Sequence, residues 1–310
     1  MGETIVIALG GNALIKHGQK GTFDEQRKNL SEPCRQIAHL AAKYNIALTH
    51  GNGPQIGYLL LQQEAAHAVP KMPLEVLVAE SQGLLGYLIE RALENEFRKL
   101  KVDKLIATIV TGVVVDENDP AFKNPTKPIG PYYSKGEAEK LPFQTIPIHG
   151  KGYRRVVPSP KPLRILEREE IRRLVRMGII VIACGGGGIP MIERGEKIRG
   201  VEAVIDKDLA TSKLAQEIKA DAMILLTDVD KVSLNYGKPT EVELNSLTAA
   251  EAKKYLAAGH FPPGSMGPKV EAAIEFLESG GKRAVITSID NLEAAVSGSA
   301  GTQIFKEKFK

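Results

Sequence analysis

The stretch VIALGGNALIK, residues 6–16, runs a hydrophobic segment directly into two adjacent glycines and an asparagine. A run that is apolar at successive positions predicts a β-strand buried on both faces, as in a parallel sheet. Glycines at the end of such a strand let backbone N–H groups come close to a bound molecule, because no Cβ stands in the way. The stretch therefore predicts a fold class and one wall of a ligand site.

Further short apolar runs are predicted to be strands of the same kind. With residues 4–9, they are residues 46–49, 105–110, 179–183, 222–227 and 284–287, each expected to be buried on both faces. Between them lie segments whose apolar residues recur at helical spacing, such as Ile37, Leu40 and Ala41. This alternation predicts an α/β fold, a three-layer αβα sandwich with a mostly parallel central sheet.

One segment interrupts the alternation. Residues 116–162 are rich in Pro, Gly and Lys and contain no long helical pattern. They predict a small subdomain inserted into the first sheet, either a lid over a site or a solvated surface excursion. Arg154 and Arg155, near the end of this insert, are expected to be screened surface charges or to help dock such a lid.

Bulk composition excludes several classes of protein. The chain has 310 residues, 41 of them basic and 37 acidic, so its formal net charge of +4 indicates neither a nucleic-acid nor a membrane partner. Cys34 and Cys184 lie far apart without any metal-ligand spacing, which fits a reducing compartment. No apolar run is long enough to span a membrane, and no leader segment is expected. A soluble, cytoplasmic protein is predicted.

Glycines gather at four predicted junctions, residues 10–12, 51–53, 185–188 and 264–267. Ligands bind at such junctions in open parallel sheets, because unpaired backbone N–H groups attract anions there. Tight turns also use glycine without a ligand, but four sites together favour an anion. The pattern GxxxxGK[ST] is absent, and GNGPQIG at 51–57 has its third glycine one residue late for a dinucleotide site. A dehydrogenase is thus only a minor alternative.

Two lysines occupy unfavourable positions at predicted helix starts. Lys207 lies between Asp206 and Asp208 in VIDKDLA, and Lys269 directly follows GSMGP. A cation at a helix N-terminus opposes the helix dipole, at a cost of a few tenths to about 1 kcal/mol. Screening by solvent would make this placement harmless. Alternatively, each ammonium neutralises charge on a phosphoryl group during its transfer.

Eight motifs, in order along nearly the whole chain, resemble those of the carbamate kinases in the amino-acid kinase family. They are ALGGNAL, THGNGPQIG, NPTKPIGP, RRVVPSP, CGGGGIP, VEAVIDKDLA, LTDVD and GSMGPKV. Acetylglutamate kinase and aspartokinase carry a lysine two residues before the first glycine pair, where this chain has Ala8. The resemblance implies that a different lysine takes over its work.

The resemblance also implies a domain organisation and a reaction. The N-terminal lobe, residues 1–183 including the insert 116–162, is implied to hold the phosphoryl acceptor, and residues 184–310 the nucleotide. The reaction is ATP plus carbamate giving ADP plus carbamoyl phosphate, readily reversible. Mg²⁺ is expected to accompany the nucleotide, with no direct protein ligand. A homodimer is implied as well, and the physiological direction of the reaction stays open.

The roles of individual residues come from the same resemblance. Lys127, in the insert, is implied to reach the transferring phosphate, and Asp208 to hold the lysines in place. Lys207 and Lys269 are implied to bridge the β- and γ-phosphates. The residues implied or predicted around the two substrates are Thr227, Asp228, Val229, Met266 and Gly267 at the adenine and ribose, and Gly10, Gly11, Asn12, Gly51, Asn52 and Gly53 at the carbamate and γ-phosphate.

Two other functions remain open, together with two residues of uncertain use. A family kinase acting on a different carboxylate or nucleotide is disfavoured by Ala8 and Lys127, and a non-catalytic nucleotide sensor by the presence of all three lysines. His50 and Cys184 are expected to pack in the core or to support the site without contacting the substrates. Carbamate already carries an anionic oxygen, so its phosphorylation requires no side-chain nucleophile or base.

Overall fold

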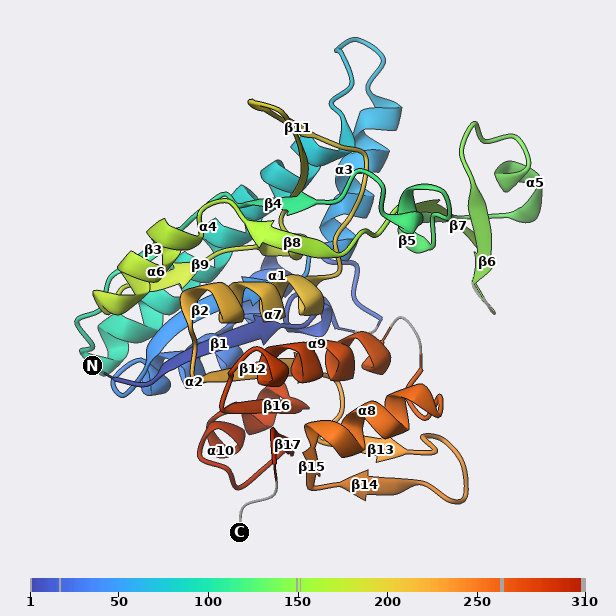
Figure 1. Ribbon diagram of the computed structural model, residues 1–310. Helices are drawn as coiled ribbons and strands as arrows, with labels where there is room; N and C mark the ends of the chain where they lie inside the picture. Colours follow the sequence, from blue (N-terminus) through green and yellow to red (C-terminus); the bar gives the residue numbers. More distant parts are fainter. Residues whose placement is uncertain (1, 17, 149, 151, 263–264, 308–310) are drawn as a thin grey trace.

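The computed structural model describes residues 2–16, 18–148, 150, 152–262 and 265–307. An eight-stranded sheet runs through its centre in the order β15-β17-β16-β12-β1-β2-β9-β3 (Figure 1). Neighbouring strands are parallel except for β16 and β17. In that order the strands are Ser246–Thr248, Thr302–Phe305, Arg283–Ser288, Ala222–Thr227, Thr4–Leu9, Asn45–His50, Ile180–Ile182 and Ile106–Thr108.

Strand β1 shows why this sheet is the middle of three layers. Ile5, Ile7 and Leu9 belong to one hydrophobic cluster, whereas Val6 and Ala8 belong to another, and all five are fully buried. Successive side chains of a strand face opposite sides, so an apolar strand needs a helical layer on each face. Burying one large aliphatic side chain stabilises the fold by roughly 1.5–3 kcal/mol.

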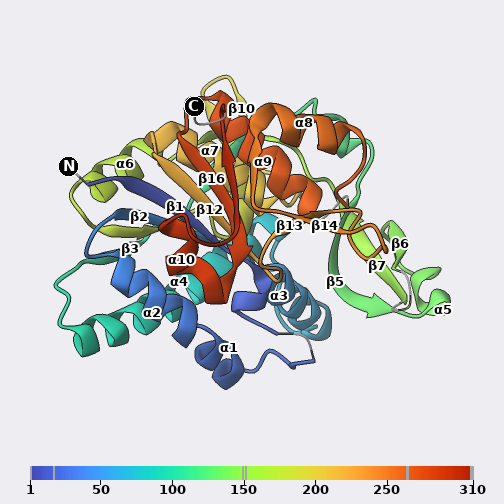
Figure 2. The same cartoon turned by 90° about the horizontal axis from the view of Figure 1, so that it is seen from below.

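The helices supply these two layers (Figures 1 and 2). The cluster that contains Val6 is covered by α6 (Arg168–Arg176), α7 (Lys207–Ile218), α8 (Ala249–Ala257) and α9 (Met266–Glu278). The cluster that contains Ile5 is covered by α2 (Ser31–Leu40), α4 (Leu74–Leu100) and α10 (Leu292–Val296), with α1 (Phe23–Asn29) leading into α2. The predicted three-layer α/β fold is therefore confirmed.

Both hydrophobic clusters combine residues from the two halves of the chain. Val6 and Ile286 share one cluster, and Leu9 and Val285 share the other. The central sheet is also continuous across residue 183, because β12 pairs directly with β1. The predicted division into lobes 1–183 and 184–310 stays a prediction.

The insert leaves a second sheet, not the first. This four-stranded sheet has the order β11-β10-β4-β8, formed by Lys197–Gly200, Ile189–Arg194, Gly112–Val115 and Pro162–Ile165. The insert departs after β4 and returns into β8, and these two strands are antiparallel partners. The prediction that it interrupts the first sheet was wrong, because the chain leaves that sheet at β3 before the insert begins.

Within the insert, three strands form a sheet that projects from the body of the molecule (Figure 1). They are β5 (Lys127–Tyr133), β6 (Thr145–Ile148) and β7 (Gly152–Val157), with the short helix α5 (Lys135–Ala138) between the first two. Ile129 and Val157 pack with Ile56 and Leu60 of α3 (Gly53–Ala65) in a third cluster. The insert is thus anchored to the helix that follows β2.

Strand β3 also differs from its prediction. Residues 105–110 were expected to form a strand buried on both faces, but only Ile106–Thr108 are extended, and all three are half-buried. Leu105 is 67% exposed. The strand lies at the edge of the sheet, where a neighbour on one side is missing. None of the described helices is long and apolar enough to cross a membrane.

Candidate functional site

Six separated segments of the described chain line one cavity of about 260 Å³, which we call the lysine cavity. It opens where β1 and β2 end, at the edge of a parallel sheet where ligands bind. Most of the predicted catalytic and acceptor residues meet there. They are Gly11, Gly51, Asn52, Gly53, Lys127, Lys207, Asp208 and Lys269.

Ion pairs with two aspartates hold the three lysines at this cavity. Asp208 Oδ1 accepts a hydrogen bond from Lys207 Nζ at 2.5 Å, and its Oδ2 accepts one from Lys269 Nζ at 3.1 Å. Lys127 Nζ donates to Asp206 Oδ2 at 2.8 Å. Three ammonium groups and two carboxylates leave one positive charge in excess, in a space whose charged groups are mostly buried. Such a site favours an anion.

Asp206 was not among the predicted site residues, although it organises two parts of this network. Its Oδ1 accepts from the backbone N–H groups of Asp208 and Leu209 and so caps the start of α7. Its Oδ2 holds Lys127 of the insert. The signal was present in the sequence, because an aspartate directly before a helix is a preferred N-cap.

Burial and neighbouring charge act together on this network. Burial lowers the pKa of Lys207, Asp208 opposes this effect, and Lys269 adds to it. Burial raises the pKa of Asp206, but Lys127, Lys207 and the Asp208 N–H together lower it by more. The net effect is a lowered pKa. The carboxylate of Asp206 therefore stays ionised beside its lysine.

The two residues of the first glycine pair are glycines for different physical reasons. A Cβ at Gly10 would lie 2.8 Å from the Leu226 carbonyl oxygen, so this glycine lets β1 end close against β12. A Cβ at Gly11 would meet nothing within 4 Å, and Gly11 lines the lysine cavity. Gly10 does not line it. The side chain of Asn12 lies outside the described part of the chain.

The glycine run 185–188 is crowded by its surroundings. Gly186 has φ +66°, and a Cβ there would lie 2.0 Å from Asn52 Nδ2. Asn52 is buried, and its Nδ2 donates to Ser81 Oγ on α4 at 2.8 Å. The Gly186 backbone thereby completes the wall of the lysine cavity. Ser81 is a supporting residue that no motif indicated.

His50 and Cys184 are both fully buried beside this wall. Burial lowers the pKa of His50 to about 4. Burial raises the pKa of the Cys184 thiol, so it stays protonated. Neither residue lines the lysine cavity, and the packing or supporting roles expected for them stay predictions.

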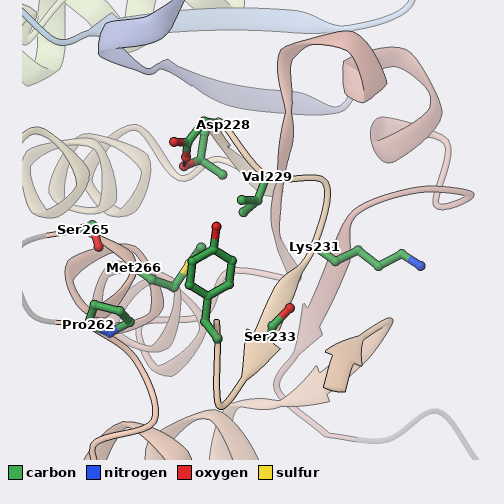
Figure 3. A pocket seen from close by; sticks show the side chains of 9 residues that line it. Asp228, Val229, Lys231, Ser233, Pro262, Ser265 and Met266 are labelled. Carbon is green, nitrogen blue, oxygen red and sulfur yellow. Dashed lines mark hydrogen bonds between the residues drawn. The ribbon is translucent and has the colours of Figure 1, made fainter. Parts of the chain in front are cut away.

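A second cavity, of about 150 Å³, lies at the end of β12, and we call it the Met266 cavity (Figure 3). Four of the five residues predicted at the nucleotide line it: Thr227, Asp228, Val229 and Met266. Gly267 does not line it, and its N–H donates to the Pro262 carbonyl at 3.0 Å.

Sequence reasoning missed several residues of the Met266 cavity. Lys231, Ser233 and Tyr236 line it from β13 (Val232–Leu234) and the adjoining turns, a region without glycine or lysine motifs. The Lys231 side chain extends away from Met266 in Figure 3, and its Nζ lies 3.6 Å from a carboxylate oxygen of Glu243 on β14 (Val242–Leu244).

Ser265 lines both cavities, so the two spaces adjoin. A space whose surface is mostly apolar, next to one with a net positive charge, matches a nucleotide, whose base is largely apolar and whose phosphates are anionic. Among the described residues, no group of three or more His, Cys, Asp or Glu side chains could hold a metal ion. Asp206 and Asp208, the carboxylates of the lysine cavity, are both bound to lysines.

A model of the amino acid kinase family matches residues 3–288, which is most of the chain. The protein belongs to this family.

Individual relatives narrow the comparison. The chain is 51% identical to the carbamate kinase of Pyrococcus horikoshii over 98% of this chain and 99% of that protein. It is 52% identical to the carbamate kinase of Thermococcus kodakarensis over 98% of this chain and 100% of that one. A solved structure of carbamate kinase from Giardia lamblia bound to AMP-PNP is 44% identical, with a TM-score of 0.93 over 99% of both chains. Within the family, the similarity is to carbamate kinases.

Proposed function

We infer that the protein is an ATP-dependent kinase that transfers a phosphoryl group reversibly between ATP and carbamate. The observation that carries this inference is the convergence of Lys127, Lys207 and Lys269 on one cavity that adjoins a second cavity with a mostly apolar surface. Carbamate kinases that are about half identical over nearly the full chain support it.

In the proposed arrangement, the adenine and ribose occupy the Met266 cavity and the phosphates pass Ser265 into the lysine cavity. Lys207 and Lys269, held by Asp208, would face the β- and γ-phosphates, and Lys127 would face the transferring group. Negative charge spreads over the transferring phosphoryl group in the transition state, and preorganised cations stabilise it there.

The acceptor would lie against the glycine backbone of residues 11, 51 and 53. A carbamate oxygen attacks the γ-phosphorus as the bond to the β–γ bridging oxygen breaks, giving carbamoyl phosphate and ADP. The attacking oxygen is already anionic, so no proton has to be removed. Catalysis then depends on alignment and charge neutralisation.

We propose Mg²⁺ as the metal that accompanies the nucleotide. Asp206 and Asp208 are each paired with lysines, so neither offers a free carboxylate to a metal ion. These residues fit a metal that is held by the nucleotide's own phosphates. When bound, the metal supplies further neutralisation of phosphate charge.

The test is a coupled assay of ADP phosphorylation by carbamoyl phosphate, run in both directions. The expected result is turnover with carbamoyl phosphate and none when acetylglutamate and ATP replace the substrates. Turnover with acetylglutamate would favour another kinase of the family. Nucleotide binding without any turnover would favour a sensor and overturn the proposal.

A homodimer in the cytoplasm completes the proposal. The β3 edge of the sheet exposes Leu105, directly before that strand, together with Tyr87 and Leu84 of the neighbouring helix α4, which supports an interface there. Both cysteines are buried and unpaired, as suits a reducing compartment. Sedimentation of the wild type and of Leu105→Glu tests the interface: a monomeric wild type would refute it.

A further inference from the structure

A third hollow, of about 500 Å³, adjoins the lysine cavity beneath the insert, and we call it the Arg154 cavity. Gly53, Pro54 and Pro128 line both spaces, which therefore meet at the start of α3. The Met266 cavity meets the lysine cavity at a different residue, Ser265. Within the described part of the chain, the lysine cavity thus adjoins both of these spaces, and the proposed nucleotide position uses only the Met266 cavity.

Among the described residues that line this hollow, Arg154 is the only charged one. It is half-buried on β7, where its Nε donates to the Gly130 carbonyl at 3.0 Å and its guanidinium lies 5.3 Å from the centre of the Tyr132 ring. Burial lowers its pKa, but a guanidinium stays charged at any physiological pH. Within the described residues, no carboxylate pairs with it.

The neighbouring arginine shows the contrast. Arg155 points to the other side of β7, where an oxygen of Glu202 lies 3.7 Å from its Nη2, and it lines none of the three cavities. Successive side chains of a strand point to opposite faces of the sheet, so these two adjacent arginines point in opposite directions. Arg154 alone directs its charge toward the proposed site.

The walls between Arg154 and the lysines also favour an anion. The 13-residue helix α3 begins at Gly53 on this boundary, and its N-cap Asn52 makes no side-chain capping bond. The N-terminus of a helix carries a partial positive charge and unpaired N–H groups. Of the described residues lining the hollow, none is acidic. Arg154, the start of α3 and Lys127 therefore place groups that attract an anion along the two adjoining spaces.

We propose that the Arg154 cavity is the entry and docking site for the small anionic substrate, carbamate in one direction and carbamoyl phosphate in the other, with Arg154 as the capturing cation. This proposal rests on the proposed function. It explains why the acceptor can reach the glycine wall while a nucleotide fills the Met266 cavity. Arg154 is a substrate-capturing residue in this account and takes no part in the chemical step.

The test is steady-state ADP phosphorylation by carbamoyl phosphate with Arg154→Gln and its matched control Arg155→Gln. The wild type must first turn over, and a wild type without turnover would overturn the proposed function itself. In Arg154→Gln the KM for carbamoyl phosphate should rise about tenfold, as expected for loss of one charge-assisted hydrogen bond. The kcat and the KM for ADP should change less than about twofold, because uniform binding affects KM alone. Arg155→Gln should leave the KM for carbamoyl phosphate near the wild-type value.

A second pair of variants does not depend on the integrity of the insert. Leu61 lines the hollow from α3 and is 41% exposed, so substitutions there leave the core untouched. Leu61→Glu should raise the KM for carbamoyl phosphate by repulsion, more strongly at low ionic strength, and Leu61→Gln should not. Equal KM values for carbamoyl phosphate in wild type, Arg154→Gln and Leu61→Glu would overturn the entry site while leaving the kinase assignment intact.

Discussion

At the scale of single residues, Lys207 and Lys269 illustrate how much structure stands behind one charge. Both ammonium groups bind the same buried carboxylate, Asp208, and both come from the first turns of helices. A lysine near the N-terminus of a helix destabilises that helix slightly. The position of both lysines at the cavity explains why this small cost is tolerated.

We expect Lys207→Ala and Lys269→Ala each to lower kcat about 10²-fold or more, since each removes a preorganised charge from the transferring phosphate. Asp208 keeps one lysine partner in either variant, so the fold should be retained. Steady-state kinetics with circular dichroism checks this, and Lys253→Ala, at an exposed pair with Glu278, is the control. Near-normal turnover in both variants would contradict the assigned role.

Asp206 caps helix α7 and binds Lys127, and different substitutions can test these two contacts separately. Asparagine caps a helix as well as aspartate does, but it holds Lys127 without charge. We therefore expect Asp206→Asn to keep the melting temperature near that of the wild type and to lower kcat about tenfold. Asp206→Ala should lose the cap as well, at about 1 kcal/mol of stability. Equal kcat values in wild type and Asp206→Asn would show that Lys127 needs no such anchor.

The same residues show what the sequence could predict. Lys127, Lys207, Asp208 and Lys269 were recognisable because each lies in a motif, and the structure brings all four to one cavity. Their catalytic roles stay predictions. Asp206 escaped notice because its importance depends on a partner 79 positions away, and such a pairing exists only in the folded chain.

At the scale of elements, the strands were predictable where they are central and unpredictable at the edges. The central strands β1 and β12 match their predicted ranges, because unbroken apolar runs leave little alternative. Strand β3 is short and half-buried, and the parent sheet of the insert was misassigned. Pairing between distant strands is set by topology, which local composition does not encode. Tyr236 and Ser233 of the Met266 cavity escaped for a related reason, since they lie outside any glycine or lysine motif.

Truncating the insert tests its contribution as an element. Ile129 and Arg155 are register partners on β5 and β7, so an Asn-Gly turn can replace residues 130–154 while Lys127 remains. We expect kcat at saturating carbamoyl phosphate to fall at least about tenfold, because the strand that positions Lys127 loses most of its sheet. None of the described residues of the insert lines the Met266 cavity, so calorimetry should find ADP affinity nearly unchanged. Loss of ADP binding in a folded truncation would contradict the assignment of the two cavities.

At the scale of the whole molecule, one buried histidine ties stability to pH. The pKa of His50 is lowered by burial from 6.5 to about 4, so the folded protein binds its proton less readily than the unfolded chain. Between pH 6.5 and 4 the unfolded state takes up more protons, and stability falls as pH falls through this window. Below about pH 4, His50 causes no further loss of stability.

We expect the free energy of unfolding to decrease by up to about 3 kcal/mol across this window through His50 alone. His50→Gln should flatten the dependence, whatever its effect at pH 7. Urea unfolding at pH 7 and pH 4.5 measures the difference, with the exposed His67→Gln as control. The same pH dependence in wild type and His50→Gln would show that other groups cause the acid sensitivity.

The glycines at 11, 51, 53 and 186 make much of the wall of the lysine cavity, where we propose that the acceptor lies, from main chain alone. An engineer who wants a roomier pocket usually trims a bulky side chain, but at these four positions there is nothing left to trim. Accommodating a larger acid on this wall would require rerouting the loops after β1, β2 and β9. Retargeting by point substitution here can therefore only narrow the range of acceptors.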